Sequence, residues 1–219
     1  MPASAIVQSA LFLVLTAAAL FASAGTFALP GFWIYLAILT AATVVSLAIL
    51  DPDLIRERMR PGGKRPPLGL RLVGIIPFLQ WIAAGLDRGR LHWSDTVPVW
   101  LQAVGLVATA AGFALFLWAM SVNPFFSSIA RIQAERGQRV VTKGPYGVVR
   151  HPGYSAAFLL ILGSGVALGS WLAESIVVVL GVPLLVYRIV TEDRLLKRAL
   201  PGYRDYAARV RGRIVPGLW

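Results

Sequence analysis

Long apolar segments separated by shorter polar ones dominate this chain. Two of them, residues 6–29 and 31–50, come first and are joined by a short turn. A third, shorter segment covers 72–86, and a fourth covers 97–120. A helix needs roughly 20 apolar residues to cross a bilayer. The pattern therefore predicts membrane-spanning helices rather than the core of a soluble domain.

The C-terminal half differs in pattern. A polar loop over 121–153 precedes two apolar segments of 15 and 17 residues, 154–168 and 171–187, and a charged tail with helical character follows over 188–219. Segments of this length are near the lower limit for crossing a bilayer, so they form either two short spans or a hairpin that does not fully traverse. We expect an all-α fold, a polytopic transmembrane bundle of five to six membrane helices with a long cytosolic loop and a C-terminal helical tail.

Composition agrees with a membrane protein and excludes several other classes. The 219 residues are 57% hydrophobic and only 14% charged, against about 25% charged in soluble domains. The net charge of +11 does not indicate nucleic acid, because the basic residues lie in loops beside the apolar segments, where they meet lipid headgroups. The absence of cysteine excludes disulfides, thiolate metal sites and a cysteine nucleophile. With only two histidines, we also expect no metal site.

The distribution of basic residues predicts the orientation. All 21 Lys and Arg residues except Arg88 and Arg90 fall in the second-to-third connection, in the loop over 121–153 or in the tail. Basic residues accumulate in cytoplasmic loops. We therefore expect both termini, the long loop and the tail on the cytoplasmic side, with an even number of crossings.

The long loop contains the densest cluster of chemically capable residues. It holds Lys143-Gly144-Pro145-Tyr146 and then Arg150-His151-Pro152-Gly153-Tyr154. Glycine permits close approach of the backbone to a ligand, proline stiffens the loop, and tyrosine and histidine offer flat, partly polar surfaces. This spacing favours a bound polar ligand at the membrane surface. A rigid basic loop whose tyrosines sit at headgroup level is the alternative.

Two further groups follow the last apolar segment. Arg188 and Glu192 are four residues apart and share a face if the helix continues; they form either a surface ion pair or part of a site on the same side as the loop. The tail carries Gly202-Tyr203-Arg204-Asp205-Tyr206 and several arginines. It either lies on anionic lipid or closes over a ligand as a lid.

Four single positions carry smaller expectations. Gly163 and Gly165 predict close helix packing. Glu174, at the turn between the last two apolar segments, is expected to be solvated. Asn123 is expected to end the fourth span, from where its side chain could reach into a site.

Taken together, these motifs resemble the isoprenylcysteine carboxyl methyltransferase family, and they are also similar to membrane phospholipid N-methyltransferases. The resemblance covers about Asn123 to the C-terminus. It implies a membrane region over 1–120 and a catalytic region over 121–219 that binds S-adenosylmethionine on the cytosolic side. It further implies cofactor contacts from one set of residues: Gln133, Val141, Gly144, Tyr146, His151, Tyr154 and Glu192. Arg188 and Glu192 would be the catalytic residues. The family has a second glutamate where this chain has Asp193.

The acceptor is left open among several chemistries. A carboxylate on an isoprenoid-type substrate, held by Arg188, is favoured over a phospholipid amine or a small thiol, for which Glu192 would handle the proton. A small transporter is disfavoured because no inverted repeat is evident and the apolar segments carry almost no charge. A non-catalytic scaffold that binds lipid through its tail is the remaining class.

Overall fold

The computed structural model describes residues 3–63 and 73–219, and its regular elements there are all helical. The helices are α1 (Ala3–Ala24), α2 (Pro30–Ile49), α3 (Pro52–Met59), α5 (Ile75–Leu86), α6 (Val99–Val122), α7 (Pro152–Ala167), α8 (Trp171–Ala199) and α9 (Tyr203–Arg209). Short helical turns cover Pro61–Gly63, Asp87–Leu91, Ala134–Arg136 and Gly144–Gly147. The predicted all-α fold is confirmed.

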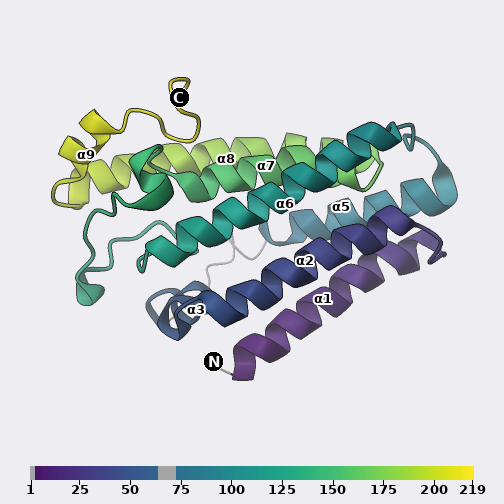
Figure 1. The fold of residues 1–219 in the computed structure, drawn as a ribbon, viewed down its shortest axis with the longest axis horizontal. Helices are drawn as coiled ribbons and strands as arrows, with labels where there is room; N and C mark the ends of the chain where they lie inside the picture. The colour runs from purple at the N-terminus through teal and green to yellow at the C-terminus, as the bar shows by residue number, and fades with distance from the viewer. Residues whose placement is uncertain (1–2, 64–72) are drawn as a thin grey trace.

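The helices form an elongated bundle (Figure 1). α7 packs between α6 and α8, while α5 contacts both α1 and α8, and α2 contacts α6. α3, α9 and the long loop lie together at one end of the bundle, and both chain termini lie toward that end. This end carries most of the polar residues.

Four helices, α1, α2, α6 and α8, are long and apolar enough to cross a membrane. Large apolar side chains on them face outward: Val14, Val107 and Val179 are each more than 60% exposed. Such exposure suits lipid rather than water, and the protein is a polytopic membrane protein. α7 is apolar but has 16 residues, and α5 has 12, so of the five to six predicted membrane helices four have full spanning length.

Helix α8 extends beyond the predicted apolar segment. The expected apolar segment 171–187 does not end where charge begins; α8 continues for 29 residues to Ala199. Its polar end is stabilised within the helix by Lys197 Nζ, 2.8 Å from Asp193 Oδ2 one turn earlier, as i,i+4 pairs do. The start of the predicted tail is therefore helix, and α8 has the length that 171–187 alone lacks.

The polar connection after α2 contains the short helix α3. Asp51 caps it, since its Oδ1 accepts a hydrogen bond from Asp53 N at 2.7 Å, and Pro52 occupies the first helical position, where its missing N–H costs nothing. Residues 64–71 of this connection, and the first residue of the predicted segment 72–86, lie outside the described residues.

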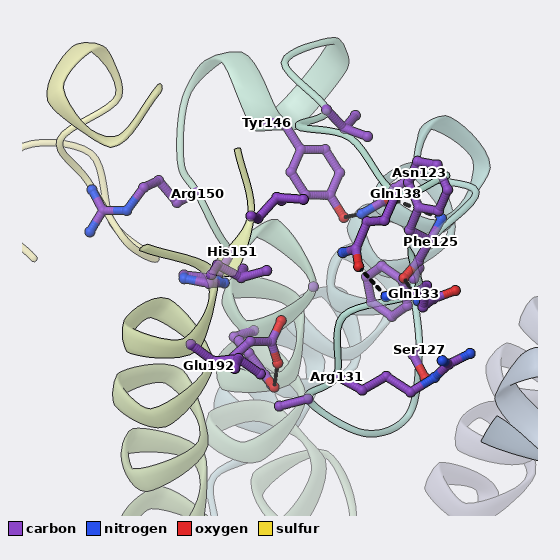
Figure 2. A pocket seen from close by; sticks show the side chains of 18 of the residues that line it. Asn123, Phe125, Ser127, Arg131, Gln133, Gln138, Tyr146, Arg150, His151 and Glu192 are labelled. Atoms are coloured by element: carbon purple, nitrogen blue, oxygen red, sulfur yellow. Dashed lines mark hydrogen bonds between the residues drawn. The ribbon is translucent and has the colours of Figure 1, made fainter. Parts of the chain in front are cut away.

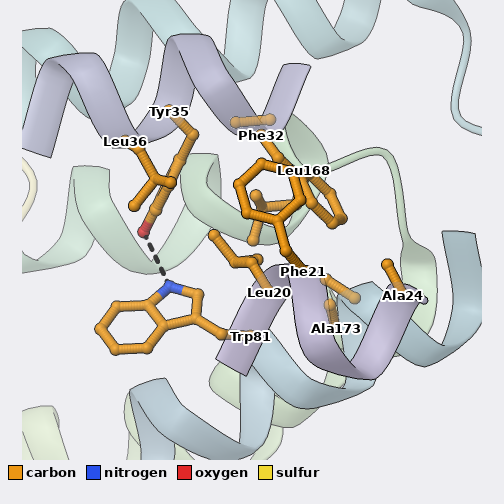
Figure 3. Close-up of a cluster of buried hydrophobic side chains, with 11 residues drawn as sticks. Leu20, Phe21, Ala24, Phe32, Tyr35, Leu36, Trp81, Leu168 and Ala173 are labelled. Atoms are coloured by element: carbon orange, nitrogen blue, oxygen red, sulfur yellow. Dashed lines mark hydrogen bonds between the residues drawn. The ribbon is translucent and has the colours of Figure 1, made fainter. Parts of the chain in front are cut away.

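One apolar cluster holds the N-terminal helices against the turn between α7 and α8 (Figure 3). Leu20 of α1, Phe32 of α2 and Leu168 after α7 are almost fully buried in it. Trp81 Nε1 of α5 donates a hydrogen bond to Tyr35 Oη of α2 at 3.2 Å. Burial of polar groups among membrane helices requires such internal pairing.

Small residues allow α6 and α7 to cross closely. A Cβ placed on Gly105 would lie only 2.8 Å from Gly163 O and 2.5 Å from Ala167 N. Such a contact has no room for a side chain, as in the small-residue interfaces of other membrane helices. The predicted packing role of Gly163 is confirmed. Gly165 is similarly packed, against Glu174.

The prediction for Glu174 is wrong. Its side chain is buried, and its Oε2 accepts hydrogen bonds from Gly165 N at 3.1 Å and Val166 N at 3.2 Å. The carboxylate faces the end of α7 rather than solvent, because α8 turns back directly against α7 after Leu168. It fastens the two helices at the end of the bundle away from the long loop.

A second carboxylate, Asp87, acts at the same end. It accepts hydrogen bonds from Ser94 N at 2.8 Å, Ser94 Oγ at 2.5 Å and Ser170 Oγ at 2.6 Å. Burial alone would raise the pKa of Asp87, but the hydrogen bonds from Ser170 and Ser94 outweigh it and hold the pKa below its ordinary value. This site joins the end of α5 to the α7–α8 turn.

Candidate active site

A cavity of about 330 Å³ lies where α3, the loop after α6 and the ends of α7 and α8 meet. Tyr203 and Tyr206 of α9 also line it. Figure 2 shows loop residues such as Asn123, Gln133 and Tyr146 facing His151 and Glu192 of the helical side. The volume falls in the range of small-molecule sites, about 300–1,000 Å³. The cavity combines polar and apolar walls.

The structure brings most of the predicted site residues together here. Seven of them line the cavity: Gln133, Val141, Tyr146, His151, Tyr154, Arg188 and Glu192. They come from the long loop, the start of α7 and the end of α8. The sequence distance between Gln133 and Glu192 is closed because α7 and α8 pack side by side.

Gly144 is the predicted residue that is not part of the cavity wall. It begins the turn Gly144–Gly147 with φ of 57°, in the left-handed region that glycine adopts without strain. A Cβ here would lie 3.1 Å from Trp118 Nε1 of α6. Gly144 therefore shapes the turn that presents Tyr146, rather than touching a ligand itself.

Tyr146 is held in place on two sides. Its hydroxyl accepts a hydrogen bond from Asn123 Nδ2 at 2.9 Å, and its backbone carbonyl accepts one from Tyr206 Oη at 2.7 Å. Burial raises the pKa of the Tyr146 hydroxyl above its ordinary value, and burial likewise raises the pKa of Tyr206 to about 12. Both phenols are neutral hydrogen-bonding groups. Asn123 does reach into the site.

Gln133 has a structural role in the loop as well as a place in the wall. Its side chain is buried; Nε2 donates to Phe125 O at 2.7 Å, and Oε1 accepts from Arg136 Nη1. Its backbone N donates to Gln138 Oε1 at 2.6 Å. Gln133 therefore organises the loop, and Gln138 joins it in the cavity wall.

Arg188 and Glu192 share a face as predicted but do not pair directly. Tyr154 lies between them: its hydroxyl donates to Glu192 Oε2 at 2.6 Å and accepts from Arg188 Nε at 3.3 Å. Arg188 Nη2 donates to Ser128 O at 2.8 Å. The Arg188 guanidinium and the Glu192 carboxylate therefore both line the cavity without forming an ion pair with each other. The direct ion pair between Arg188 and Glu192, one of the two possibilities from the sequence, does not form.

Asp193, at the position where the family has a second glutamate, is the buried centre of a hydrogen-bond cluster beside the cavity. It is 2% exposed, and its Oδ1 accepts from Arg150 Nε at 2.9 Å and from Tyr203 Oη at 3.1 Å. His151 Nε2 lies 3.2 Å from the same oxygen. This nitrogen of His151 therefore contacts Asp193 and does not point a free hydrogen-bonding group into the cavity. Asp193 thus orients three side chains that line the cavity.

The last residues of the described chain are bound to the same centre. Arg150 N donates to Gly212 O at 3.0 Å, and His151 N donates to Arg213 O at 2.8 Å. Ser155 Oγ donates to Ile214 O at 2.6 Å. The tail is therefore a strap packed behind the His151 turn, and its contribution to the cavity comes from Leu200, Tyr203 and Tyr206. The tail therefore packs against the rest of the protein and is not a separate segment that lies only on lipid.

The fold and site together define an integral membrane protein with a helical bundle and a small-molecule cavity at one end. A family model for phospholipid methyltransferases matches residues 100–201, the stretch from α6 to the turn after α8. Among curated proteins, the chain is 28% identical over 146 residues to protein-S-isoprenylcysteine O-methyltransferase B of Arabidopsis thaliana, covering 64% of this chain and 70% of that protein. The predicted resemblance to these membrane methyltransferases is confirmed.

Two bacterial proteins are also similar. The chain is 31% identical over 133 residues to the cobalt-zinc-cadmium resistance protein CzcN of Cupriavidus metallidurans, covering 60% of this chain and 57% of that protein. It is 29% identical over 129 residues to the nickel-cobalt-cadmium resistance protein NccN of Alcaligenes xylosoxydans xylosoxydans, covering 58% and 56%. The match thus spans little more than half the length of these two relatives.

Proposed function

We propose that the cavity binds S-adenosylmethionine and that the protein transfers its methyl group to an apolar, lipid-like acceptor. The observation that carries this proposal is the convergence of seven motif residues, separated by up to 59 positions, on one cavity of about 330 Å³. The similarity of residues 100–201 to phospholipid methyltransferases supports the same chemistry.

The residues present fit this cofactor. The Glu192 carboxylate suits a hydroxyl or ammonium group, and the rings of Tyr146 and Tyr154 suit a flat heterocycle or a cation. Gln133, Val141 and His151 complete the wall, while Gly144 acts through the turn it shapes. When bound, S-adenosylmethionine supplies a methyl group activated by its positively charged sulfur.

The protein's own part in such a transfer is to position the acceptor and exclude water. Arg188 can hold a carboxylate in a two-pronged contact, and the Tyr154 hydroxyl keeps Arg188 and Glu192 in fixed relation. A carboxylate acceptor gives up no proton, so the site needs no general base for it. We therefore propose a carboxylate on an isoprenoid-type substrate as the acceptor.

A phospholipid amine is the second candidate, and the description of the matching family favours it. Glu192 would then take the proton from the amine. The uncompensated arginine at the cavity favours the carboxylate, because a cationic or protonated amine would be repelled by it. For either acceptor we propose that the cavity faces the cytoplasm, since most of the basic residues gather at this end of the bundle.

The test is calorimetric binding of S-adenosylmethionine and S-adenosylhomocysteine to the detergent-purified protein. Micromolar binding is expected, with loss of at least tenfold in Glu192→Gln. Glu135→Gln is the matched control, because Glu135 is an exposed carboxylate on the long loop, paired with Arg131. A monodisperse, folded wild type that binds neither compound contradicts the proposal and favours a lipid-binding scaffold.

A further inference from the structure

Arg58 of α3 lines the cavity although it belongs to the N-terminal region, before the residues that match the family model. Its guanidinium lies 5.2 Å from the centre of the Phe116 ring and 5.1 Å from that of Phe126. Cation–π contacts of this length position a guanidinium but do not neutralise it. Sequence patterns gave no sign of this role, because Arg58 is one of several arginines in a basic connection.

The charges around the cavity do not balance at Arg58. Arg150 is paired with Asp193, and Arg131 with Glu57. Within residues 3–63 and 73–219, neither Arg58 nor Arg188 has a carboxylate within 4 Å, and the segments outside these ranges contain no Asp or Glu. Two half-buried guanidinium groups, those of Arg58 and Arg188, therefore face the cavity, where Glu192 is the one lining carboxylate among the described residues. Arg139 also lines the cavity, but it is exposed.

The two arginines are close enough to affect each other. Burial, and then the charge of Arg188, lowers the pKa of Arg58 to about 10, so Arg58 is still protonated at neutral pH. Ser128 connects the two arginines. Its side-chain Oγ donates to the backbone carbonyl of Arg58 at 3.0 Å, and its own backbone carbonyl accepts from Arg188 Nη2 at 2.8 Å. An anion bound between them would relieve their mutual repulsion.

The same part of the cavity is apolar on its membrane side. Phe116 of α6, Ala157 of α7 and Leu185 of α8 line it, and all three come from the apolar parts of their helices. A ligand that satisfies both features carries an acidic group next to a hydrocarbon chain. This combination differs from a free inorganic anion, which would gain nothing from the apolar wall.

We infer that Arg58, together with Arg188, forms a subsite for the acidic headgroup of an amphiphilic acceptor, and that Arg58 determines specificity for that charge. The inference rests on the proposed function and names its substrate class. A carboxylate could also come from the methionine part of the cofactor, so the experiment separates the two sources.

The experiment measures binding of N-acetyl-S-farnesyl-cysteine and of its uncharged carboxamide to the protein in lipid nanodiscs, with and without S-adenosylhomocysteine. The wild type is expected to prefer the acid by at least tenfold. Arg58→Gln is expected to abolish that preference while the affinity for S-adenosylhomocysteine changes less than threefold. Arg56→Gln is the matched control: it removes a charge from the same helix, but Arg56 is exposed and pairs with Asp53, so the preference stays.

Three results overturn the inference. The first is equal binding of acid and amide by the wild type, and the second is an unchanged preference in Arg58→Gln. The third is loss of S-adenosylhomocysteine binding with the preference intact, which assigns Arg58 to the cofactor. If Arg58→Gln does not fold, Arg58→Lys decides: a weaker but measurable preference is expected, because lysine lacks the two-pronged geometry, and an unchanged one overturns the inference.

Failure of the proposed function has a different signature. It appears as a wild type that binds neither S-adenosylmethionine nor its product. The comparison of acid with amide made without cofactor still decides the subsite in that case.

Discussion

Replacing Asp193 by asparagine tests whether one buried carboxylate holds the cavity wall together. The change keeps the shape of the side chain and removes its charge. Arg150, whose side chain is 5% exposed, is then left buried without a counter-ion, with the neutral amide oxygen and the backbone carbonyls of Val210 and Arg211 as its partners. Lys197 and Arg213 also lose their partner, but they are 38% and 29% exposed and can turn to solvent.

The expected magnitude follows from the buried pair. Removing one partner of a buried ion pair costs about 3–5 kcal/mol, and the two more exposed contacts add little. For a chain of this size, 1 kcal/mol corresponds to about 2–4 °C in Tm. Asp193→Asn is therefore expected to lower Tm by about 6–20 °C in a thermal unfolding scan of the detergent-solubilised protein.

Two companion variants sharpen this test. Asp53→Asn breaks an exposed ion pair with Arg56, and such pairs contribute less than about 1 kcal/mol. The double change Asp193→Asn with Arg150→Met removes the orphaned charge as well, and it should unfold at or above the temperature of the single variant. A Tm for Asp193→Asn within the range of Asp53→Asn would refute the reasoning. It would also be refuted if the Tm of the double variant fell by the sum of the losses caused by Asp193→Asn and by Arg150→Met alone.

Three further predictions concern other parts of the molecule. Gly105→Val is expected to destabilise by about 1–3 kcal/mol through overpacking of the α6–α7 crossing, seen as a lower Tm, whereas Ala110→Val on the exposed side of α6 leaves Tm unchanged. Because the folded-state pKa of Asp87 lies below its ordinary value of 3.8, its stabilisation is present above about pH 4 and is lost as the pH falls through the folded pKa. Asp87→Asn should therefore unfold more easily at pH 7 but lose less on acidification than the wild type, and equal losses would contradict this. Tyr154→Phe removes a hydrogen bond to the charged Glu192, worth about 1.5 kcal/mol, and should lower methyl transfer about tenfold in an assay with radiolabelled methyl donor; unchanged transfer would exclude a positioning role.

The membrane helices could be predicted because composition alone identifies segments that suit lipid. The helical character of residues 188–199 could be predicted too, but their continuity with the apolar segment 171–187 in a single helix could not. Arg188, Glu192 and Asp193 look like the start of a polar tail, since a sequence does not show that their side chains are taken up by a cavity and by partners on other elements. Helix propensity and the pair from Asp193 to Lys197 then carry the helix to Ala199.

The site was predictable where its residues cluster in a motif, and less so where they act across the fold. Tyr146, His151 and Tyr154 occur together in the sequence and line one cavity. Asp193 belongs to an acidic pair with Glu192, but no local pattern shows that it acts on Arg150, 43 positions earlier. Arg58 has no signal in the sequence, and it reaches the cavity because α3 lies against the loop after α6. Long-range partners of this kind depend on packing, which a local pattern does not encode.

The strap formed by the last residues has a consequence for how the protein is made. Gly212, Arg213 and Ile214 supply carbonyls to Arg150, His151 and Ser155, so the turn that carries His151 has its full set of partners only after these residues have been synthesised. During translation the spanning helices can enter the bilayer one after another while the cavity is still open and incomplete. The cavity is then complete only after synthesis and membrane insertion, and a ribosome stalled before Gly212 would leave an inserted bundle with an unfinished cavity.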